Sequence, residues 1–135
     1  MSINSLSISG SGMSAERARL DSIARNIANA QTTRGANGGA YRRQMVVFEA
    51  IPSDASGKSG GVHASDPIES QAELIKIHNP GHPHADAQGN VEMPNVNIVE
   101  EMVDMIAATR AYEANVGAAN ATKAMISRAI DLGRL

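Results

Sequence analysis

The residues best suited to chemistry are three histidines and an aspartate in the segment HNPGHPHAD: His78, His82, His84 and Asp86. Imidazole and carboxylate groups are suitable ligands for zinc. Structural zinc sites, however, usually take their ligand spacing from a helix or a tight knuckle, whereas Pro80 and Pro83 interrupt this segment. We therefore interpret it as a rigid proline-rich turn with solvent-facing histidines, and we expect neither a metal site nor a cofactor.

Other catalytic chemistry has no support in the sequence. The chain contains no cysteine, which excludes disulfides, thiolate metal sites and cysteine nucleophiles. It has no phosphate-loop glycine pattern and no recognisable hydroxyl nucleophile motif. The adjacent carboxylates Glu100 and Glu101 would point about 100° apart on a helix, so they are better explained as negative charge at a helix N-terminus. We expect no catalytic residues and predict that the protein is not an enzyme.

The charge and hydropathy patterns argue against two classes of partner. Residues 1–45 contain six arginines and two acidic residues, but no aromatic platform or nucleic-acid-binding motif accompanies them. No apolar run approaches the ~20 residues of a membrane span. We therefore expect no nucleic acid and no direct membrane insertion. The first 20 residues lack the basic and apolar regions of a cleaved signal peptide, which favours a cytoplasmic protein or export without cleavage.

The last forty residues predict one long helix. Asn97 is a suitable N-cap with Glu100 three residues later, and Gly133 stands where a C-terminal cap belongs. We therefore expect a helix over residues 98–132. Its residues recur at alternating spacings of four and three, the pattern of a heptad seam: Ile98, Met102, Met105, Thr109, Tyr112, Val116, Ala119, Lys123, Ile126 and Ile130. The charged residues off this seam are expected in solvent: Glu100, Glu101, Asp104, Arg110, Glu113 and Arg128.

A second, weaker helical stripe occupies the N-terminal segment, with Ile3, Leu6, Met13, Leu20 and Ile27 on the same seven-residue repeat. Gly10 and Gly12 are expected to interrupt this helix. After residue 26 the chain favours turns. The side-chain amides of Asn26 and Asn29 are expected to bind backbone groups at this helix end, or to bind a neighbouring subunit, because buried amides need partners.

The segment between the helices has the composition of short strands and turns. Strands are expected at 41–51, 61–64, 73–77 and 90–93, with a linker at 52–61. We therefore predict a mainly α, elongated fold with a small β region. Its N- and C-terminal helices are expected to pair as a coiled-coil-like core, with short antiparallel strands between them. The expected parts are an N-terminal helical segment (1–33), a β-rich region (34–96) and the long C-terminal helix (97–135).

The sequence resembles the axial proteins of the bacterial flagellum along nearly its whole length. The N-terminal rod signature is matched by Leu20, Asn26, Ile27, Ala28, Asn29 and Thr32, followed by Tyr41, Arg42, Val46, Val47 and Phe48. A more specific block points to the proximal rod: residues 79–83, Ala85, Asp86, Gly89, Val91, residues 93–97, Glu100, Met102, Val103 and residues 110–115. The chain departs from the family pattern at Asn79, at Asn90 and in the glycine loop 33–40.

The resemblance implies a structural subunit whose terminal helices pack into the inner tube of a helical rod and which transmits torque across the periplasm. It also implies export without signal cleavage. The implied partners are other rod proteins, further copies of the chain, and membrane-ring and export-gate components at the rod base. The residues expected at subunit interfaces are Leu6, Met13, Leu20, Asn26, Ile27, Asn29, Ile98, Met102, Met105, Tyr112, Val116, Ile126 and Ile130.

Three other hypotheses remain open at the level of the sequence. The chain could be another rod, hook or filament protein of the same structural class. It could be a coiled-coil adaptor, which would dimerise at a fixed stoichiometry in dilute solution. A small metal-dependent enzyme built on the histidine segment is a third hypothesis, which stoichiometric zinc binding in calorimetry would support.

Overall fold

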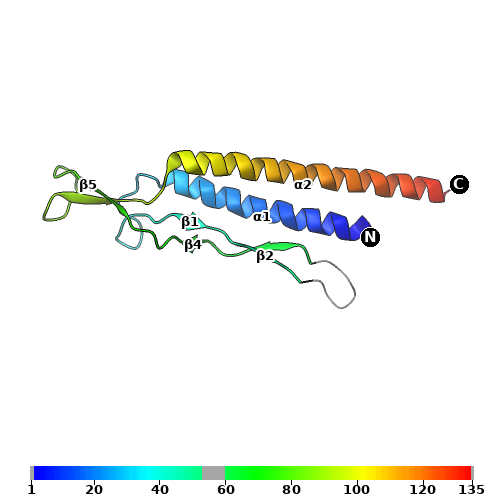
Figure 1. Cartoon of the computed structure of the whole chain (residues 1–135), viewed down its shortest axis with the longest axis horizontal. Coiled ribbons are helices and arrows are strands. Elements are labelled where there is room, and N and C mark those ends of the chain that lie inside the picture. Colours follow the sequence, from blue (N-terminus) through cyan, green and yellow to red (C-terminus); the bar gives the residue numbers. More distant parts are fainter. Residues whose placement is uncertain (1, 53–59, 135) are drawn as a thin grey trace. The chain divides into compact units, whose positions relative to one another are not determined.

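The computed structural model describes residues 2–52 and 60–134 (Figure 1). In that part of the chain, one helix precedes a series of short strands and a second helix follows them. The helices are α1 (Ser2–Ala28) and α2 (Ile98–Gly133), and the strands are β1 (Gln44–Met45), β2 (Phe48–Ala50), β3 (Val62–Ala64), β4 (Ile68–Glu69), β5 (Ile75–His78) and β6 (Asn90–Met93). The prediction of a mainly helical fold with a small β region between terminal helices is confirmed.

The helix α2 begins and ends where its capping residues predict. The side chain of Asn97 accepts a hydrogen bond from the backbone N–H of Val99 at 3.1 Å. Its backbone carbonyl accepts the N–H of Glu101 at 3.0 Å. The first bond satisfies a donor that the first turn of a helix otherwise leaves unpaired, and the second is the first hydrogen bond of the helix itself. The observed end at Gly133 lies one residue beyond the predicted one.

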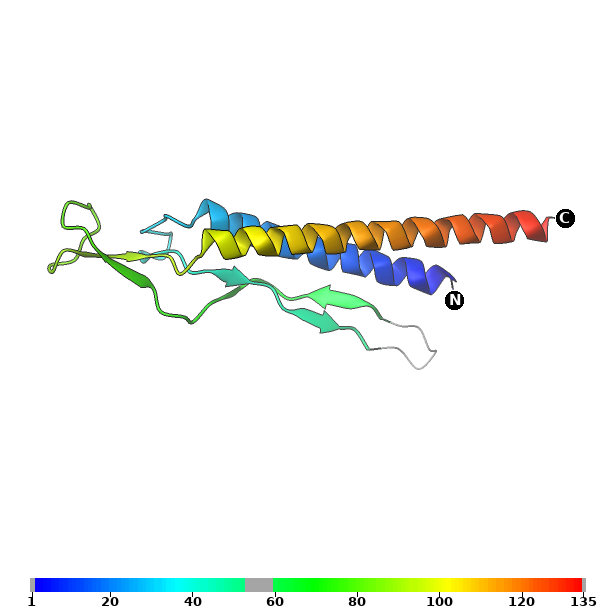
Figure 2. The same ribbon diagram turned by 45° about the horizontal axis from the view of Figure 1, so that its top comes forward.

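The helix α1 is continuous, so the predicted interruption at Gly10 and Gly12 was wrong. Each glycine costs a helix about 1 kcal/mol relative to alanine, but packing against a second helix offsets such a cost. Gly12 lies where that packing is close: a Cβ atom placed on it would be 3.0 Å from the side-chain nitrogen of Asn115. Figures 1 and 2 show α1 and α2 side by side and antiparallel. The predicted pairing of the terminal helices is confirmed.

The strands form three antiparallel pairs, β1 with β4, β2 with β3, and β5 with β6. The single strand predicted at 41–51 is divided in two, because its first part pairs with β4 and its second with β3. The change of partner occurs at Val47, whose N–H donates to the side chain of Ser65 and whose carbonyl accepts the Ser65 N–H. The strand β4 was not predicted. Residues 53–59, most of the predicted linker, lie outside the described part of the chain.

The chain divides into two compact units. The first contains the described residues of 1–20, 46–66 and 106–135, and the second contains residues 21–45 and 67–105. The pair β2–β3 belongs to the first unit, whereas β1–β4 and β5–β6 belong to the second. Each unit includes part of both helices. Neither α1 nor α2, over the residues described, has the length and apolar character that a membrane-crossing helix needs.

Buried side chains are few and often polar in the described chain. The buried apolar residues are Ala15, Ile23, Val91, Pro94, Val96 and Ala108. The buried polar residues are Ser9, Glu16, Ser22, Asn26, Glu101 and Thr122. Most large apolar side chains of α2 lie outside this core, which leaves them available for contacts with other molecules.

Candidate functional site

The contact between the helices in the first unit is made by small side chains. Gly12 of α1 faces Asn115 of α2 so closely that an added Cβ would lie 3.0–3.1 Å from the side chain of Asn115. Ala15 and Ala108 are both buried, at 2% and 0% exposure. Thr122 is buried as well, and its hydroxyl donates to the carbonyl of Ala118 at 2.9 Å. Small residues let two helix backbones approach closely, so this interface covers little apolar side-chain area.

The covered face of α2 follows a heptad repeat, but it is rotated from the predicted one. Its buried residues Glu101, Ala108 and Thr122 fall on one heptad position, which half-buried Asn115 also occupies. The predicted seam instead began at Ile98 and Met102. Of the ten seam residues, six are exposed and four are half-buried, namely Met105, Val116, Ala119 and Ile126. A set of small and polar residues with the same period lies at the buried position of the helix pair.

The predicted interface residues have three kinds of environment. Leu6, Ile98, Met102, Tyr112 and Ile130 are exposed. Met13, Leu20, Ile27, Asn29, Met105, Val116 and Ile126 are half-buried. Asn26 is buried within its own chain, at 1% exposure. The exposed group is free to meet a partner.

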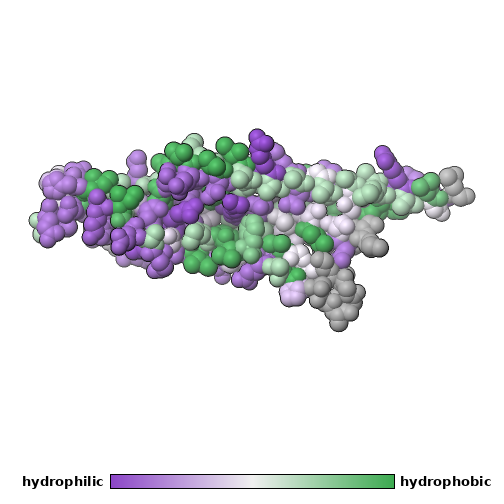
Figure 3. Space-filling view, viewed as in Figure 1, coloured by the Kyte–Doolittle hydropathy of each residue, from purple (hydrophilic) through white to green (hydrophobic). Residues whose placement is uncertain are grey.

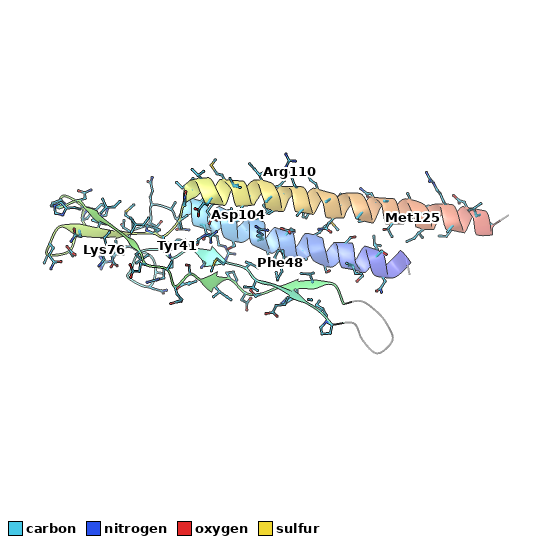
Figure 4. All side chains as sticks on the ribbon, in the orientation of Figure 1. Tyr41, Phe48, Lys76, Asp104, Arg110 and Met125 are labelled. Carbon is cyan, nitrogen blue, oxygen red and sulfur yellow. The ribbon has the colours of Figure 1, made fainter. Side chains whose placement is uncertain are left out.

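A second apolar surface on α2 contains Met102 of the predicted seam and three residues that were not predicted at an interface. It consists of Val99, Met102, Val103 and Ile106, which are 56–68% exposed, and is called the outer face of α2 below. These residues recur at intervals of three and four, so they form one stripe on the helix. Figure 3 shows hydrophobic side chains gathered over the first turns of α2. Further along, the side chain of Arg110 projects from the side of α2 away from α1 (Figure 4).

The second unit contains a network of buried and half-buried polar groups, called the polar junction below: Ser22, Asn26, Tyr41, Arg43, Gln44, Asn95, Glu101 and Asp104. Asn26 is its centre. The amide nitrogen of Asn26 donates to the backbone carbonyl of Gln44 at 2.8 Å and to the carboxylate of Glu101 at 3.0 Å. Its amide oxygen accepts the backbone N–H of Gln44 at 2.8 Å and the hydroxyl of Tyr41 at 2.9 Å. All four hydrogen-bonding positions of this side chain are therefore used.

Glu101 forms the other half of the polar junction. It is fully buried, and its second carboxylate oxygen accepts the Nε–H of Arg43 at 2.5 Å. The same guanidinium group reaches Asp104 at 3.3 Å, and the backbone N–H of Arg43 donates to Asn95 at 2.8 Å. The prediction that Glu101 stays in solvent was wrong. Its carboxylate can be buried because the guanidinium of Arg43 and the amide of Asn26 bind it. Both partners are distant in the sequence, so no local pattern indicated them.

The hydroxyl of Tyr41 titrates above its ordinary range. Burial raises the pKa of Tyr41, the charge of Arg25 lowers it in part, and the carboxylates of Glu101 and Glu69 raise it further. Figure 4 shows Tyr41 and Asp104 near the C-terminal end of α1. Since the neutral phenol donates to Asn26, its protonated form belongs to the intact junction.

Asn29 forms hydrogen bonds within its own chain. The sequence analysis left two alternatives open, backbone groups at this helix end or a neighbouring subunit, and the structure has the first. Its amide nitrogen donates to the carbonyl of Arg25 at 2.9 Å, and its oxygen accepts the hydroxyl of Thr32 at 3.2 Å. The carbonyl of Arg25 also accepts the backbone N–H of Asn29 at 3.0 Å, so the side chain of Asn29 adds a second bond at the end of α1. Asn26 and Asn29 therefore both hold backbone groups of their own chain.

The histidine segment forms a turn between β5 and β6. The rings of His82 and His84 meet edge to face at 5.4 Å, and His84 shares a hydrogen bond of 2.8 Å with the hydroxyl of Thr33. Asp86 accepts the backbone N–H groups of Asn90 and Gln88, and these bonds, the one from Asn90 first, lower the pKa of its carboxyl. Over residues 2–52 and 60–134, no group of three or more such side chains is arranged to hold a metal ion.

Comparison with known proteins identifies both ends of the chain. Residues 6–36 match the family model described as flagella basal body rod protein. Residues 87–132 match the model described as flagellar basal body rod FlgEFG protein C-terminal. These two matches contain most of α1 and α2.

Several relatives match this chain along nearly its whole length. The flagellar basal-body rod protein FlgC of Escherichia coli O6:H1 is 42% identical over 132 residues, which cover 98% of both chains. The FlgC of Salmonella typhimurium is 42% identical with the same coverage, and that of Bacillus subtilis is 38% identical over 97% of both chains. The chain therefore belongs to the FlgC family of flagellar basal-body rod proteins.

Proposed function

We propose that this protein is a structural subunit of the proximal rod of the flagellar basal body, that it assembles helically through α1 and α2, and that the assembly transmits torque across the periplasm. Membership of the FlgC family supports the rod. The exposed outer face of α2 is the observation that carries assembly through the helices.

The outer face of α2 is costly to leave in water. Full burial of one valine, methionine or isoleucine side chain is worth about 1.5–3 kcal/mol, and these four residues are more than half exposed. Contiguous apolar surface of this kind usually marks a protein interface. Burial against neighbouring subunits would therefore stabilise the assembly rather than the single chain.

The exposed residues elsewhere on the helices extend this argument. Leu6 of α1 and Ile130 and Leu132 of α2 are exposed as well. Apolar residues on different faces of the helices suit contacts with different neighbours, which an open helical assembly needs because its interfaces do not close on themselves.

The partners follow from the family and from the surface. We propose contacts with other rod proteins, with further copies of this chain, and with membrane-ring and export-gate components at the rod base. The relatives are named as rod proteins, which favours a structural role without catalysis. No nucleic acid and no direct insertion into the membrane are part of the proposal. Export without signal cleavage is a further part of it, and mass spectrometry of the subunit in isolated basal bodies would test it.

The substitution Val103→Asp tests assembly through the outer face. Val103 is 61% exposed, so the charged variant is expected to keep the unfolding midpoint of the isolated chain. Burying the new carboxylate between subunits would cost several kcal/mol, so rods are expected to be lost from basal bodies and motility with them. Val103→Leu keeps an apolar side chain at the same position and is expected to support motility. Normal rods built from Val103→Asp would exclude this face from the assembly.

A further inference from the structure

The small residues between α1 and α2 do little to fix the position of one helix along the other. Gly12 faces Asn115, and Ala108 and Thr122 lie one heptad before and after Asn115. A slip of one heptad would therefore place Gly12 opposite another residue no larger than asparagine. Small side chains give weak penalties for such shifts, so another feature must select one alignment.

The polar junction has the specificity that the small residues lack. A slip of one heptad moves one helix about 10 Å along the other, at 1.5 Å per residue. This shift would break the hydrogen bond from Asn26 to Glu101, and one amide N–H and one carboxylate oxygen would each lose a partner in a buried position. Unpaired buried polar groups are strongly unfavourable, whereas misplaced small apolar residues are not.

The junction also connects the helix alignment to the first strand. Asn26 binds both the N–H and the carbonyl of Gln44 in β1, and the hydroxyl of Ser22 donates to the same carbonyl at 3.1 Å. Arg43, the residue before β1, binds Glu101 of α2. The helix α1, the strand β1 and the helix α2, which are distant in the sequence, therefore meet at the buried side chain of Asn26.

We propose that Asn26 and Glu101 are positioning residues that set the register of α1 against α2 and, through Gln44, the placement of β1. This inference concerns the fold of the single chain and does not rest on the rod function. Buried polar groups that select one register among several are known from coiled coils.

Engineered disulfides measure the register directly, because the chain has no cysteine of its own. The pair Gly12→Cys with Asn115→Cys reports the observed alignment. The pairs of Gly12→Cys with Ala108→Cys and with Thr122→Cys report a slip of one heptad in either direction. A disulfide needs Cα atoms within about 7 Å, so a helix shifted by ~10 Å cannot form the wrong pair.

In the otherwise unchanged chain at low concentration, we expect the 12–115 disulfide to form at least about tenfold faster than either slipped pair. With Asn26→Leu and Glu101→Leu together, the slipped pairs are expected to form at rates within about threefold of the observed pair. Asn120→Leu, the same change at an exposed position, serves as the control and is expected to keep the original preference. An unchanged preference in a helical double-leucine variant would overturn the proposal.

If the double-leucine variant loses its helices, a second pair of variants tests the proposal. These variants exchange the amide of Asn26 and the carboxylate of Glu101. Asn26→Asp places a carboxylate against Glu101, and we expect the slipped disulfides to appear. Adding Glu101→Gln returns a donor to the pair, and we expect the preference for the 12–115 disulfide to recover by at least about fivefold. If the exchanged pair shows the same disulfide pattern as Asn26→Asp alone, Asn26 and Glu101 do not set the register.

Discussion

The hydroxyl of Tyr41 is the part of the polar junction that can be removed with least change in packing. Tyr41→Phe deletes one hydrogen bond to Asn26 and keeps the ring. The free energy of unfolding is expected to fall by about 1 kcal/mol, the typical net value of such a bond. Tyr112→Phe makes the same chemical change at an exposed ring and is expected to have almost no effect. Urea denaturation of the three chains measures both values.

The raised pKa of Tyr41 adds a dependence on alkaline pH. Because the folded chain holds the phenol neutral more strongly than the unfolded chain does, this contribution to stability is complete below the ordinary pKa of 10.0 and is lost as pH rises through the folded value. The stability difference between the unchanged chain and Tyr41→Phe is therefore expected to shrink above about pH 10. A difference that grows with pH over this range would contradict the assignment.

Asp86 gives the opposite dependence at acid pH. Its pKa lies below the ordinary value of 3.8, first because of the hydrogen bond from the Asn90 N–H. The stabilisation is present above that ordinary value and is lost as pH falls through the lower, folded one. Asp86→Asn is therefore expected to be less stable than the unchanged chain at neutral pH, with the difference disappearing in acid. Asp66→Asn, at another exposed aspartate, is the control in the same thermal unfolding series.

At the scale of elements, substitutions of two glycines in α1 distinguish the effect of helix propensity on stability from the effect of packing. Gly10 has open space where a Cβ would lie, whereas a Cβ on Gly12 would meet Asn115 at 3.0–3.1 Å. Gly10→Ala is expected to stabilise the chain by about 0.5–1 kcal/mol through propensity alone. Gly12→Ala is expected to gain less than Gly10→Ala or to destabilise, because the helices must separate by a few tenths of an ångström. Thermal unfolding of both variants provides the comparison, and equal stabilisation would show that the helices are not in close contact at Gly12.

The bounds of the elements could be read from the sequence where the signals are local. Asn97 and Gly133 define α2 through groups within one turn of its ends. The strand β6 was predicted at its observed residues, 90–93. Gly10 and Gly12 misled the prediction because a propensity counts the cost of a glycine within its own helix, whereas the contact with Asn115 that accommodates Gly12 comes from the other end of the chain.

The polar junction could not be predicted for the same reason of distance. Arg43 and Glu101 are separated by 58 residues, and Asn26 and Glu101 by 75. A glutamate on a predicted helix is ordinarily solvated, so Glu101 had no local signal of burial. The buried heptad position of α2 was not recognised because a search for apolar repeats passes over Ala108 and Asn115. Six of the ten residues that the search selects are exposed.

At the scale of the whole molecule, the last turns of α2 lack cover within the described chain. Residues 127–134 are all exposed, whereas Glu101 and Ala108 are fully buried. In dilute solution the backbone amides of 127–133 are expected to exchange with solvent rapidly, and those near 101–108 slowly, because local opening follows burial. In isolated rods the last turns are expected to become protected. Hydrogen exchange with mass spectrometry measures both states, and slow exchange of 127–133 in the dilute chain would show that they are covered without a partner.

The close contact of Gly12 with Asn115 has a consequence for the history of the chain. A side chain can be added at position 12 only where the side chain at position 115 leaves room for it. The two positions therefore constrain each other in evolution although they lie in different helices. Across the descendants of a common rod ancestor, substitutions at 12 and 115 are therefore expected to occur as pairs, with a larger residue at one position accompanied by a smaller residue at the other.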